Sequence, residues 1–183
     1  MKRLMQFAFV VLAATLVVPA AHAACSTELL PGPPLCSELF YDVHFAQACN
    51  AWVFSGDGAT KNTTQGNSYA QLENSLISSF FEQTVAVVAA PNGGTDLSMG
   101  FNVNMVGSYP GTERLQVEIR STGGTLLQTV ASVSPSSGSG RYDYTLPSSY
   151  VGQTIKVRFR YVRHSAPGDT QFRVTYAQFF TCD

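Results

Sequence analysis

Apolar and polar residues alternate along most of the chain from Trp52 onward, with a period of two. Leu115, Val117 and Ile119 alternate with polar residues, and the pattern recurs in TIKVRFRYVR, residues 154–163. This period is typical of antiparallel strands that bury one face and expose the other. Turn signals such as PNGG, STGG and SAPGD separate the alternating segments. The pattern predicts nine strands, at residues 51–55, 68–73, 83–90, 96–106, 113–121, 125–133, 141–146, 154–163 and 171–181.

Nine short strands with regular turns predict an all-β fold, an antiparallel β-sandwich of jelly-roll type, rather than an α/β fold. We expect residues 49–183 to form the sandwich. Residues 24–48, which contain the Pro-rich stretch LPGPPLC, are expected to pack along a sheet edge as an N-terminal arm. The pattern leaves room for one helical turn, near residues 37–46.

Two aromatic residues are expected in the interior. Trp52, the one tryptophan, alternates with Phe54, and we expect it in the core. In the last strand, Tyr176 falls on the same side as Phe172 and Val174. The sequence therefore predicts that Tyr176 faces inward.

The N-terminus has the three parts of a secretory signal peptide. Lys2 and Arg3 supply positive charge, residues 7–18 are apolar, and Ala21-His22-Ala23 suits a signal peptidase. The apolar segment is too short to span a bilayer as a helix. We expect cleavage after Ala23 and a secreted protein, extracellular or periplasmic, from a bacterium, with no membrane span after cleavage.

Four cysteines follow the signal segment: Cys25, Cys36, Cys49 and Cys182. An even number in a secreted chain predicts two disulfides, for which three pairings exist. The favoured pairing is Cys25–Cys36 and Cys49–Cys182. The first pair would clip the Pro-rich turn, and the second would join the first sandwich strand to the last. The spacing contains no CxxC pair, which disfavours a zinc site.

Charge restricts the partners that the chain could bind. Without Lys2 and Arg3, the 11 basic residues fall to 9 against 12 acidic ones, a net charge of −3. Nucleic-acid binding needs a basic footprint, so no nucleic-acid partner is expected. Motifs such as GxSxG, HExxH and a P-loop are missing from the sequence, which predicts a non-catalytic protein.

Residues 50–182 contain seven short motifs in a fixed order along the chain. They are NAWVFSGDG, SYAQL, FEQTV, SMGFNV, RLQVEIRSTGGTLL, VGQTIKVRFRY and TQFRVTYAQFF. In this order they resemble the jelly-roll modules of the galactose-binding-like superfamily, which include many carbohydrate-binding modules. The resemblance implies a sandwich fold and a carbohydrate ligand. The chain departs from the family in its last strand. Such modules often carry acidic residues there, one of which some of them use as a calcium ligand, whereas this chain has Tyr176-Ala177-Gln178.

The candidate ligand-binding residues are the outward ones of two predicted strands. They are Gln116, Glu118, Arg120, Lys156, Arg158 and Arg160. If these strands are neighbours, the long polar side chains meet, and they suit sugar hydroxyls or anionic groups. The alternative is ordinary cross-strand stabilisation of a solvated sheet face. Tyr109 and Tyr150 lie in turns and are candidates for exposed aromatic platforms that stack on a sugar.

Calcium is the one cofactor that the sequence leaves open. Asp57 lies in a polar loop with Asn62 and Asn67, and Asp96 follows PNGG. Hard oxygen ligands of this kind suit Ca²⁺, although the spacing of an EF-hand is missing. Asp57 and Asp96 are therefore weak calcium candidates, and no other cofactor is expected.

These observations together predict a secreted, non-catalytic module that binds a glycan of a cell wall, matrix or cell surface. The alternative is a structural or adhesive extracellular protein that acts through protein–protein contacts. A secreted hydrolase is the third possibility, because two carboxylates suffice for glycoside hydrolysis.

Overall fold

In the computed structural model of the protein, the described residues are 35–47, 49–64, 66–73, 78–107, 113–163 and 170–183. They form eleven strands: β1 (Cys36–Glu38), β2 (Val53–Ser55), β3 (Ala59–Asn62), β4 (Tyr69–Leu72), β5 (Phe80–Ala86), β6 (Asp96–Val106), β7 (Arg114–Ser121), β8 (Leu126–Val133), β9 (Gly140–Leu146), β10 (Thr154–Val162) and β11 (Gln171–Cys182). Two short 3₁₀ turns, η1 (Pro135–Ser137) and η2 (Ser148–Tyr150), complete the elements. No helix in this part of the chain is long and apolar enough to cross a membrane.

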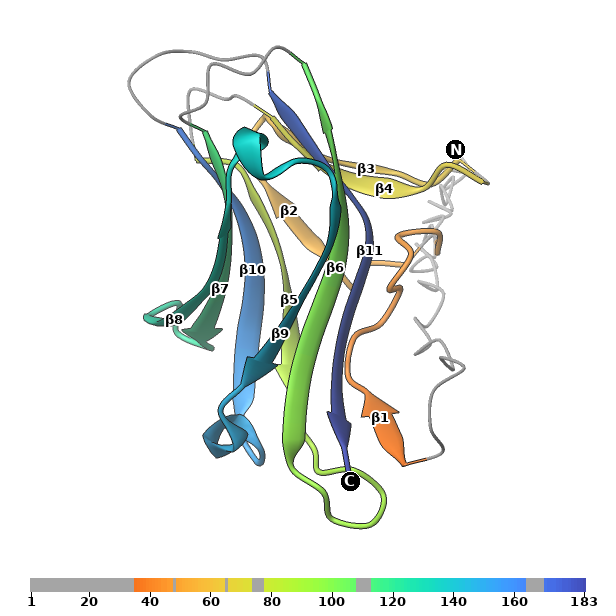
Figure 1. Ribbon diagram of the computed structural model, residues 1–183, viewed down its shortest axis with the longest axis vertical. Coiled ribbons are helices and arrows are strands. Elements are labelled where there is room, and N and C mark those ends of the chain that lie inside the picture. Colours follow the sequence, from red (N-terminus) through yellow and green to blue (C-terminus); the bar gives the residue numbers. More distant parts are fainter. Residues whose placement is uncertain (1–34, 48, 65, 74–77, 108–112, 164–169) are drawn as a thin grey trace, which may run out of the picture.

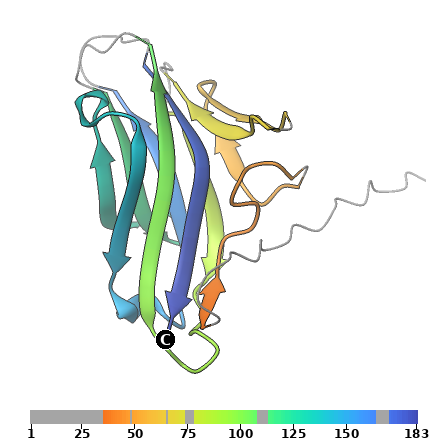
Figure 2. The ribbon, with the colours of Figure 1, turned by 45° about the vertical axis from the view of Figure 1, so that its right-hand side comes forward.

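The strands form two antiparallel sheets that face each other (Figure 1). One has the order β3-β4-β11-β6-β9, with β1 added beside β11, and the other has the order β2-β5-β10-β7-β8. The C-terminal end of β11 lies next to β1 (Figure 2). The predicted all-β sandwich of jelly-roll type is confirmed.

Each of the nine predicted strands has a counterpart, but β1 and β3 were not predicted. β3 has the sequence ATKN, which has too few apolar residues to show an alternation. β1 is three residues long and lies where a helical turn was expected, so that expectation is wrong. β1 forms because β11 offers it a pairing edge, with Glu38 opposite Phe180. The pattern of residues along the chain does not show a pairing partner that is remote in the sequence.

Trp52 lies in the core, as predicted, with 4% of its surface exposed. Its ring makes edge contacts with Phe40 at 4.9 Å and Phe81 at 5.4 Å between ring centres. Phe81 in turn stacks on Phe159 of β10 at 4.7 Å. Edge and offset contacts are the favourable geometries for aromatic rings, so this cluster joins the five-stranded sheet to the N-terminal segment.

The prediction for Tyr176 is wrong, because β11 contains a β-bulge between Val174 and Tyr176. The extra residue reverses the alternation, so that Tyr176 pairs with Asn102 on the outer side of β6. A bulge of this kind bends a strand and re-aims a side chain. Thr175 and Tyr176 therefore both reach the outer face of the six-stranded sheet.

Both favoured disulfide pairings are wrong, since Cys36 is bonded to Cys182. The two residues are directly opposite in the β1–β11 register, with Cα atoms 4.1 Å apart. Cys49 is also disulfide-bonded. The prediction failed because it placed the first pairing strand near Cys49, whereas β1 begins at Cys36 and lies against the end of β11.

Candidate functional site

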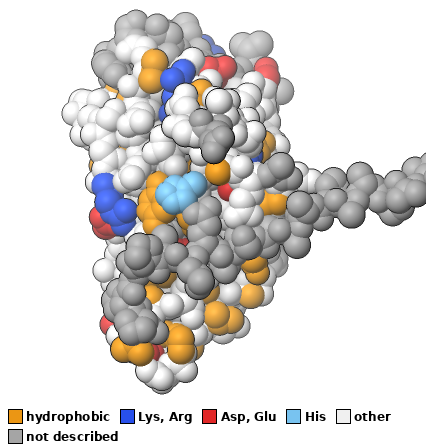
Figure 3. Space-filling model, turned by 90° about the vertical axis from the view of Figure 1, so that its right-hand side faces the viewer, with side chains coloured by type: hydrophobic (Ala, Val, Ile, Leu, Met, Phe, Trp, Pro, Cys, Tyr) orange, Lys and Arg blue, Asp and Glu red, His pale blue; other side chains and the backbone are white. Residues whose placement is uncertain are grey.

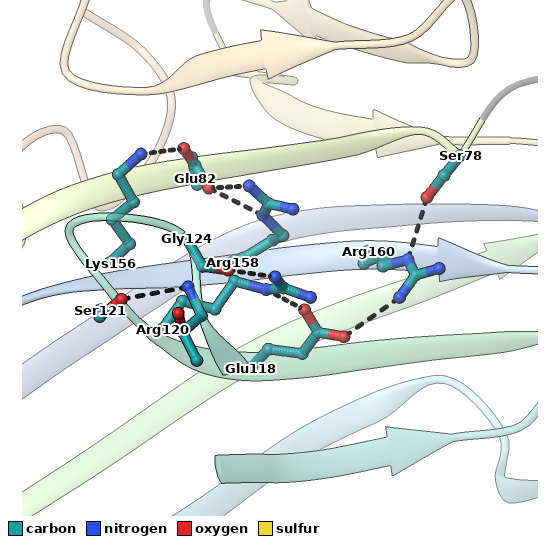
Figure 4. A network of polar contacts seen from close by, with 10 residues as sticks. Ser78, Glu82, Glu118, Arg120, Ser121, Gly124, Lys156, Arg158 and Arg160 are labelled. Carbon is teal, nitrogen blue, oxygen red and sulfur yellow. Dashed lines mark hydrogen bonds and ion pairs between the residues drawn. The ribbon is translucent and has the colours of Figure 1, made fainter. Parts of the chain in front are cut away.

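The predicted ligand-binding residues of β7 and β10 lie on neighbouring strands, and their outward side chains meet on the five-stranded sheet. We call their four cations, Arg120, Lys156, Arg158 and Arg160, the basic row. The register pairs are Lys156 with Arg120, Arg158 with Glu118, and Arg160 with Gln116. β5 lies on the other side of β10 and places Glu82 opposite Arg158. Figure 4 shows two groups of ion pairs across the three strands, one around Glu82 and one around Glu118.

Glu82 pairs with two residues of this row. Its carboxylate accepts hydrogen bonds from Lys156 Nζ at 3.0 Å and from Arg158 Nε at 2.7 Å. Burial alone would raise the pKa of Glu82, but the hydrogen bonds and charges of Arg158 and Lys156 lower it below its ordinary value. The Arg158 guanidinium also lies 3.7 Å from the centre of the Phe80 ring. Lys156 and Arg158 are therefore already engaged in the protein.

Glu118 pairs with the other cations of the row. It accepts a hydrogen bond from Arg120 Nε at 2.7 Å, and Arg160 Nη1 lies 3.5 Å from its second oxygen. Glu118 is 1% exposed, so it cannot present its carboxylate to a ligand without movement of these side chains. Four cations share two carboxylates, which leaves an excess of two positive charges on this face. This arrangement favours cross-strand stabilisation, and a ligand role for the row stays a prediction.

Of the remaining predicted site residues, those that the structure describes lie apart from these ion pairs. Tyr150 in η2 is half-buried against the core and donates a hydrogen bond to Gln128 at 3.1 Å, and burial raises its pKa. Tyr109 lies outside the described residues. Asp57 is in the β2–β3 turn and Asp96 begins β6. The described residues contain no group of three His, Cys, Asp or Glu side chains that could hold a metal ion. Calcium binding thus stays a prediction.

A groove of about 740 Å³ opens on the outer face of the six-stranded sheet. Its lining residues come from β6, β9, β11, the β3–β4 turn and the N-terminal segment: His44, Gly66, Asn67, Ser68, Asn102, Asn104, Arg141, Thr175 and Tyr176. This side of the molecule shows a histidine beside an apolar side chain, with basic and acidic groups on the same face (Figure 3). The volume falls in the range of small-ligand sites.

Two rings form an aromatic surface in this groove. The bulge on β11 brings the ring of Tyr176 to within 4.8 Å of the imidazole of His44, measured between ring centres. The Arg141 guanidinium lies 5.7 Å from the centre of the Tyr176 ring, within reach of a cation–π contact. The Tyr176 hydroxyl donates a hydrogen bond to Gln178 Oε1, which fixes the direction of the ring.

His44 is carried by a tightly held loop, residues 39–47, which we call the aromatic loop. Asp42 and Phe45 have φ values of 54° and 57°, a conformation that costs a phenylalanine of the order of 1–3 kcal/mol. Both residues are fully buried, and the Asp42 carboxylate forms an ion pair with Lys61 of β3. Burial and the ion pair therefore hold the turn in its strained conformation, and His44 remains exposed at the groove.

The polar groups of the groove are held by the sheet itself. Arg141 Nε donates to both carboxylate oxygens of Asp143, at 2.9 Å each, and this hydrogen bonding raises the pKa of Arg141. Asn102 lies between Arg141 and Tyr176 in the register, and Asn104 is two residues further along β6. Amide and guanidinium groups in fixed positions provide several hydrogen-bond donors beside an aromatic ring.

Sequence reasoning did not find this groove. The bulge at Tyr176 and the aromatic loop around His44 have no period that a pattern could show. A usable signal was present in FNVNMV, where Asn102 and Asn104 occupy successive outward positions beside apolar inward ones. Arg141 was predicted in a strand but had no recognisable partner before the β6–β9 register was known.

Comparison with known proteins gives the fold and no family. No protein-family model and no curated protein matches the chain. Among solved structures, an exo-β-agarase is similar with a TM-score of 0.54 and 11% identity, over 80% of this chain and 25% of the agarase. A mutant carbohydrate-binding module of family 29 is similar with a TM-score of 0.49 and 13% identity, over 80% of this chain and 92% of the module.

The enzymatically active domain of tailspike protein 4 from bacteriophage CBA120 has a TM-score of 0.46 and 12% identity, over 76% of this chain and 20% of that one. This chain thus spans about a quarter of the agarase and a fifth of the tailspike chain. The architecture and the agarase similarity confirm the predicted jelly-roll resemblance at the level of the fold.

Proposed function

We propose that the protein is a secreted, non-catalytic module that binds a glycan in the groove of the six-stranded sheet. The observation that carries this proposal is the Tyr176–His44 aromatic surface surrounded by the polar groups of Asn102, Asn104 and Arg141. The similarity to the agarase concerns the fold, so the chemistry of the groove has to support the ligand class.

A sugar ring offers an apolar face and a rim of hydroxyl groups. The ring of Tyr176 suits the apolar face, because an aromatic side chain supplies a flat apolar surface of limited flexibility. The amides of Asn102 and Asn104 can both donate to and accept from hydroxyl groups, and Arg141 donates only. A groove with these two kinds of surface side by side suits a polyhydroxy ligand better than a purely apolar or purely anionic one.

The carboxylates near the groove support a binding role over hydrolysis. A glycosidase usually needs two carboxyl groups that flank the bond to be cleaved. Among the described residues that line cavities on this face, Asp143 is the one carboxylate, and it is hydrogen-bonded to Arg141. Among the described residues that line these two cavities, Asp143 thus has no second carboxylate to act with it.

The test is calorimetric titration of the mature protein with neutral hexasaccharides of glucose, xylose, mannose and galactose, and with an oligogalacturonate. We expect binding of a neutral chain, and a loss of at least about tenfold in affinity in Tyr176→Ala, which corresponds to about 1.4 kcal/mol. Arg160→Ala on the opposite sheet is the control and should bind as the wild type does. Equal binding by Tyr176→Ala and weaker binding by Arg160→Ala would place the ligand on the basic row instead.

One observation favours the alternative of a structural or adhesive protein. β8 is the edge strand of its sheet, and Leu126 and Leu127 on it are 48% and 46% exposed. The strand LLQTVASV carries no charge that would prevent edge-to-edge pairing. Light scattering distinguishes the two functions, since self-association through β8 would give dimers or larger species that Leu127→Lys dissociates.

A further inference from the structure

A second, separate cavity lies further along the same sheet. This second cavity has a volume of about 210 Å³, and its lining includes Ser98 of β6, Thr145 of β9 and Phe180 of β11. The same three strands supply Asn102, Arg141 and Tyr176 to the first cavity. Both hollows therefore lie on one face, in line with the strands.

The register gives the spacing between the two cavities. Arg141, Asn102 and Tyr176 form one row across the sheet, and Thr145, Ser98 and Phe180 form another row four residues away along each strand. Strands rise about 3.3 Å per residue, so the rows are about 13 Å apart. That separation exceeds the width of a single sugar ring.

Gly100 occupies the row between the cavities. A Cβ atom at this position would lie 2.4 Å from Asp143 Oδ1, 2.8 Å from Arg141 Nη2 and 3.0 Å from Gln178 Nε2. These side chains therefore rest directly on the backbone of β6 and form a low polar floor. Any side chain at position 100 would lift them and place a ridge between the cavities.

The floor has no net charge. Arg141 and Asp143 neutralise each other through paired hydrogen bonds, and Gln178 is an amide. A uronic acid or sulfated sugar would bring its negative charge next to Asp143 while the guanidinium is already engaged. The opposite face of the sandwich, with its excess of positive charge, offers no such neutral surface.

We infer that the ligand is a chain of several neutral sugars that lies along β6, from the Tyr176 cavity across Gly100 to the Thr145 cavity. This inference rests on the proposed function and adds the class and length of the glycan. Gly100 is then the residue that determines length specificity, because it keeps the path between the two cavities open.

The test is a length series, from monosaccharide to hexasaccharide, of the neutral glycan that binds the wild type, measured at low and high salt. We expect affinity to rise at least tenfold between the disaccharide and the hexasaccharide, with little salt dependence because no net charge is neutralised. Gly100→Ala and Thr145→Arg should each remove this gain, so that the hexasaccharide binds no more tightly than the disaccharide does. Thr145 is exposed on β9, so its variant tests the path even if Gly100→Ala does not fold.

The matched control is Thr129→Arg, an exposed threonine on β8 of the other sheet, which should bind the whole series as the wild type does. Affinity that is independent of length, or unchanged in Thr145→Arg, would overturn the extended path, while the loss in Tyr176→Ala would still support a glycan site. Tighter binding of oligogalacturonate than of every neutral chain would overturn the neutral ligand class. Absence of binding to any glycan would overturn both proposals.

Discussion

The Cys36–Cys182 disulfide joins the first strand to the last and closes almost the whole sandwich. The two residues are 146 positions apart, and in the chain-entropy model a loop of this length stabilises the folded state by about 5 kcal/mol at 25 °C. In a domain of this size that corresponds to a fall of about 10–20 °C in Tm when the bond is removed. We expect this loss in the double variant Cys36→Ser/Cys182→Ser.

The assay is urea unfolding of wild type and double variant, followed by Trp52 fluorescence. β1 should stay paired in the folded variant, because the Leu39 amide donates to the Phe179 carbonyl at 2.7 Å and Phe40 is fully buried. Hydrogen exchange of the Leu39 amide checks this point. If β1 stays paired and the free energy of unfolding falls by less than about 2 kcal/mol, the entropic argument is refuted. The folded state would then be unchanged, and the disulfide would have restricted the unfolded chain less than the argument requires.

Three further predictions concern charged groups. The pKa of Glu82 is lowered in the folded state. Its contribution to stability is therefore complete above its unfolded pKa of about 4.3 and is lost as the pH falls through its folded pKa. The difference in unfolding free energy between wild type and Glu82→Gln should shrink below about pH 4, and a difference that stays constant would contradict this. The carboxylate of Glu113 is fully buried and has no hydrogen-bond partner among the described residues. Glu113→Met should therefore raise the free energy of unfolding by about 1–3 kcal/mol, and a lower Tm in this variant would contradict the argument. Lys61→Met should lower the free energy of unfolding by about 3–5 kcal/mol, because it leaves the buried Asp42 carboxylate without its ion-pair partner. It should also weaken glycan binding, because the aromatic loop carries His44. Unchanged stability would show that the Lys61–Asp42 pair does not hold this loop.

The alternation of apolar and polar residues was enough to predict most of the fold. Period-two patterns such as Leu115-x-Val117-x-Ile119 follow from local geometry, since successive side chains of a strand point to opposite faces. The predicted burial of Trp52 is also confirmed. The sequence was also enough to place Arg158 and Arg160 outward, because their neighbours lay inward. That β7 and β10 are neighbours came from the structure.

Partners that are remote in the sequence decided the rest. The pairing of Cys36 with Cys182 depends on β1 lying beside β11, and the engagement of Arg158 depends on Glu82 from a strand on the other side of β10. Tyr176 reached the groove through one bulged residue, and His44 through a buried loop with positive φ values. The sequence by itself thus determined which residues alternate, because that depends on neighbours along the chain. The tertiary structure alone decided which side chains share a surface, because contacts across sheets depend on register, and one inserted residue is enough to reverse a face.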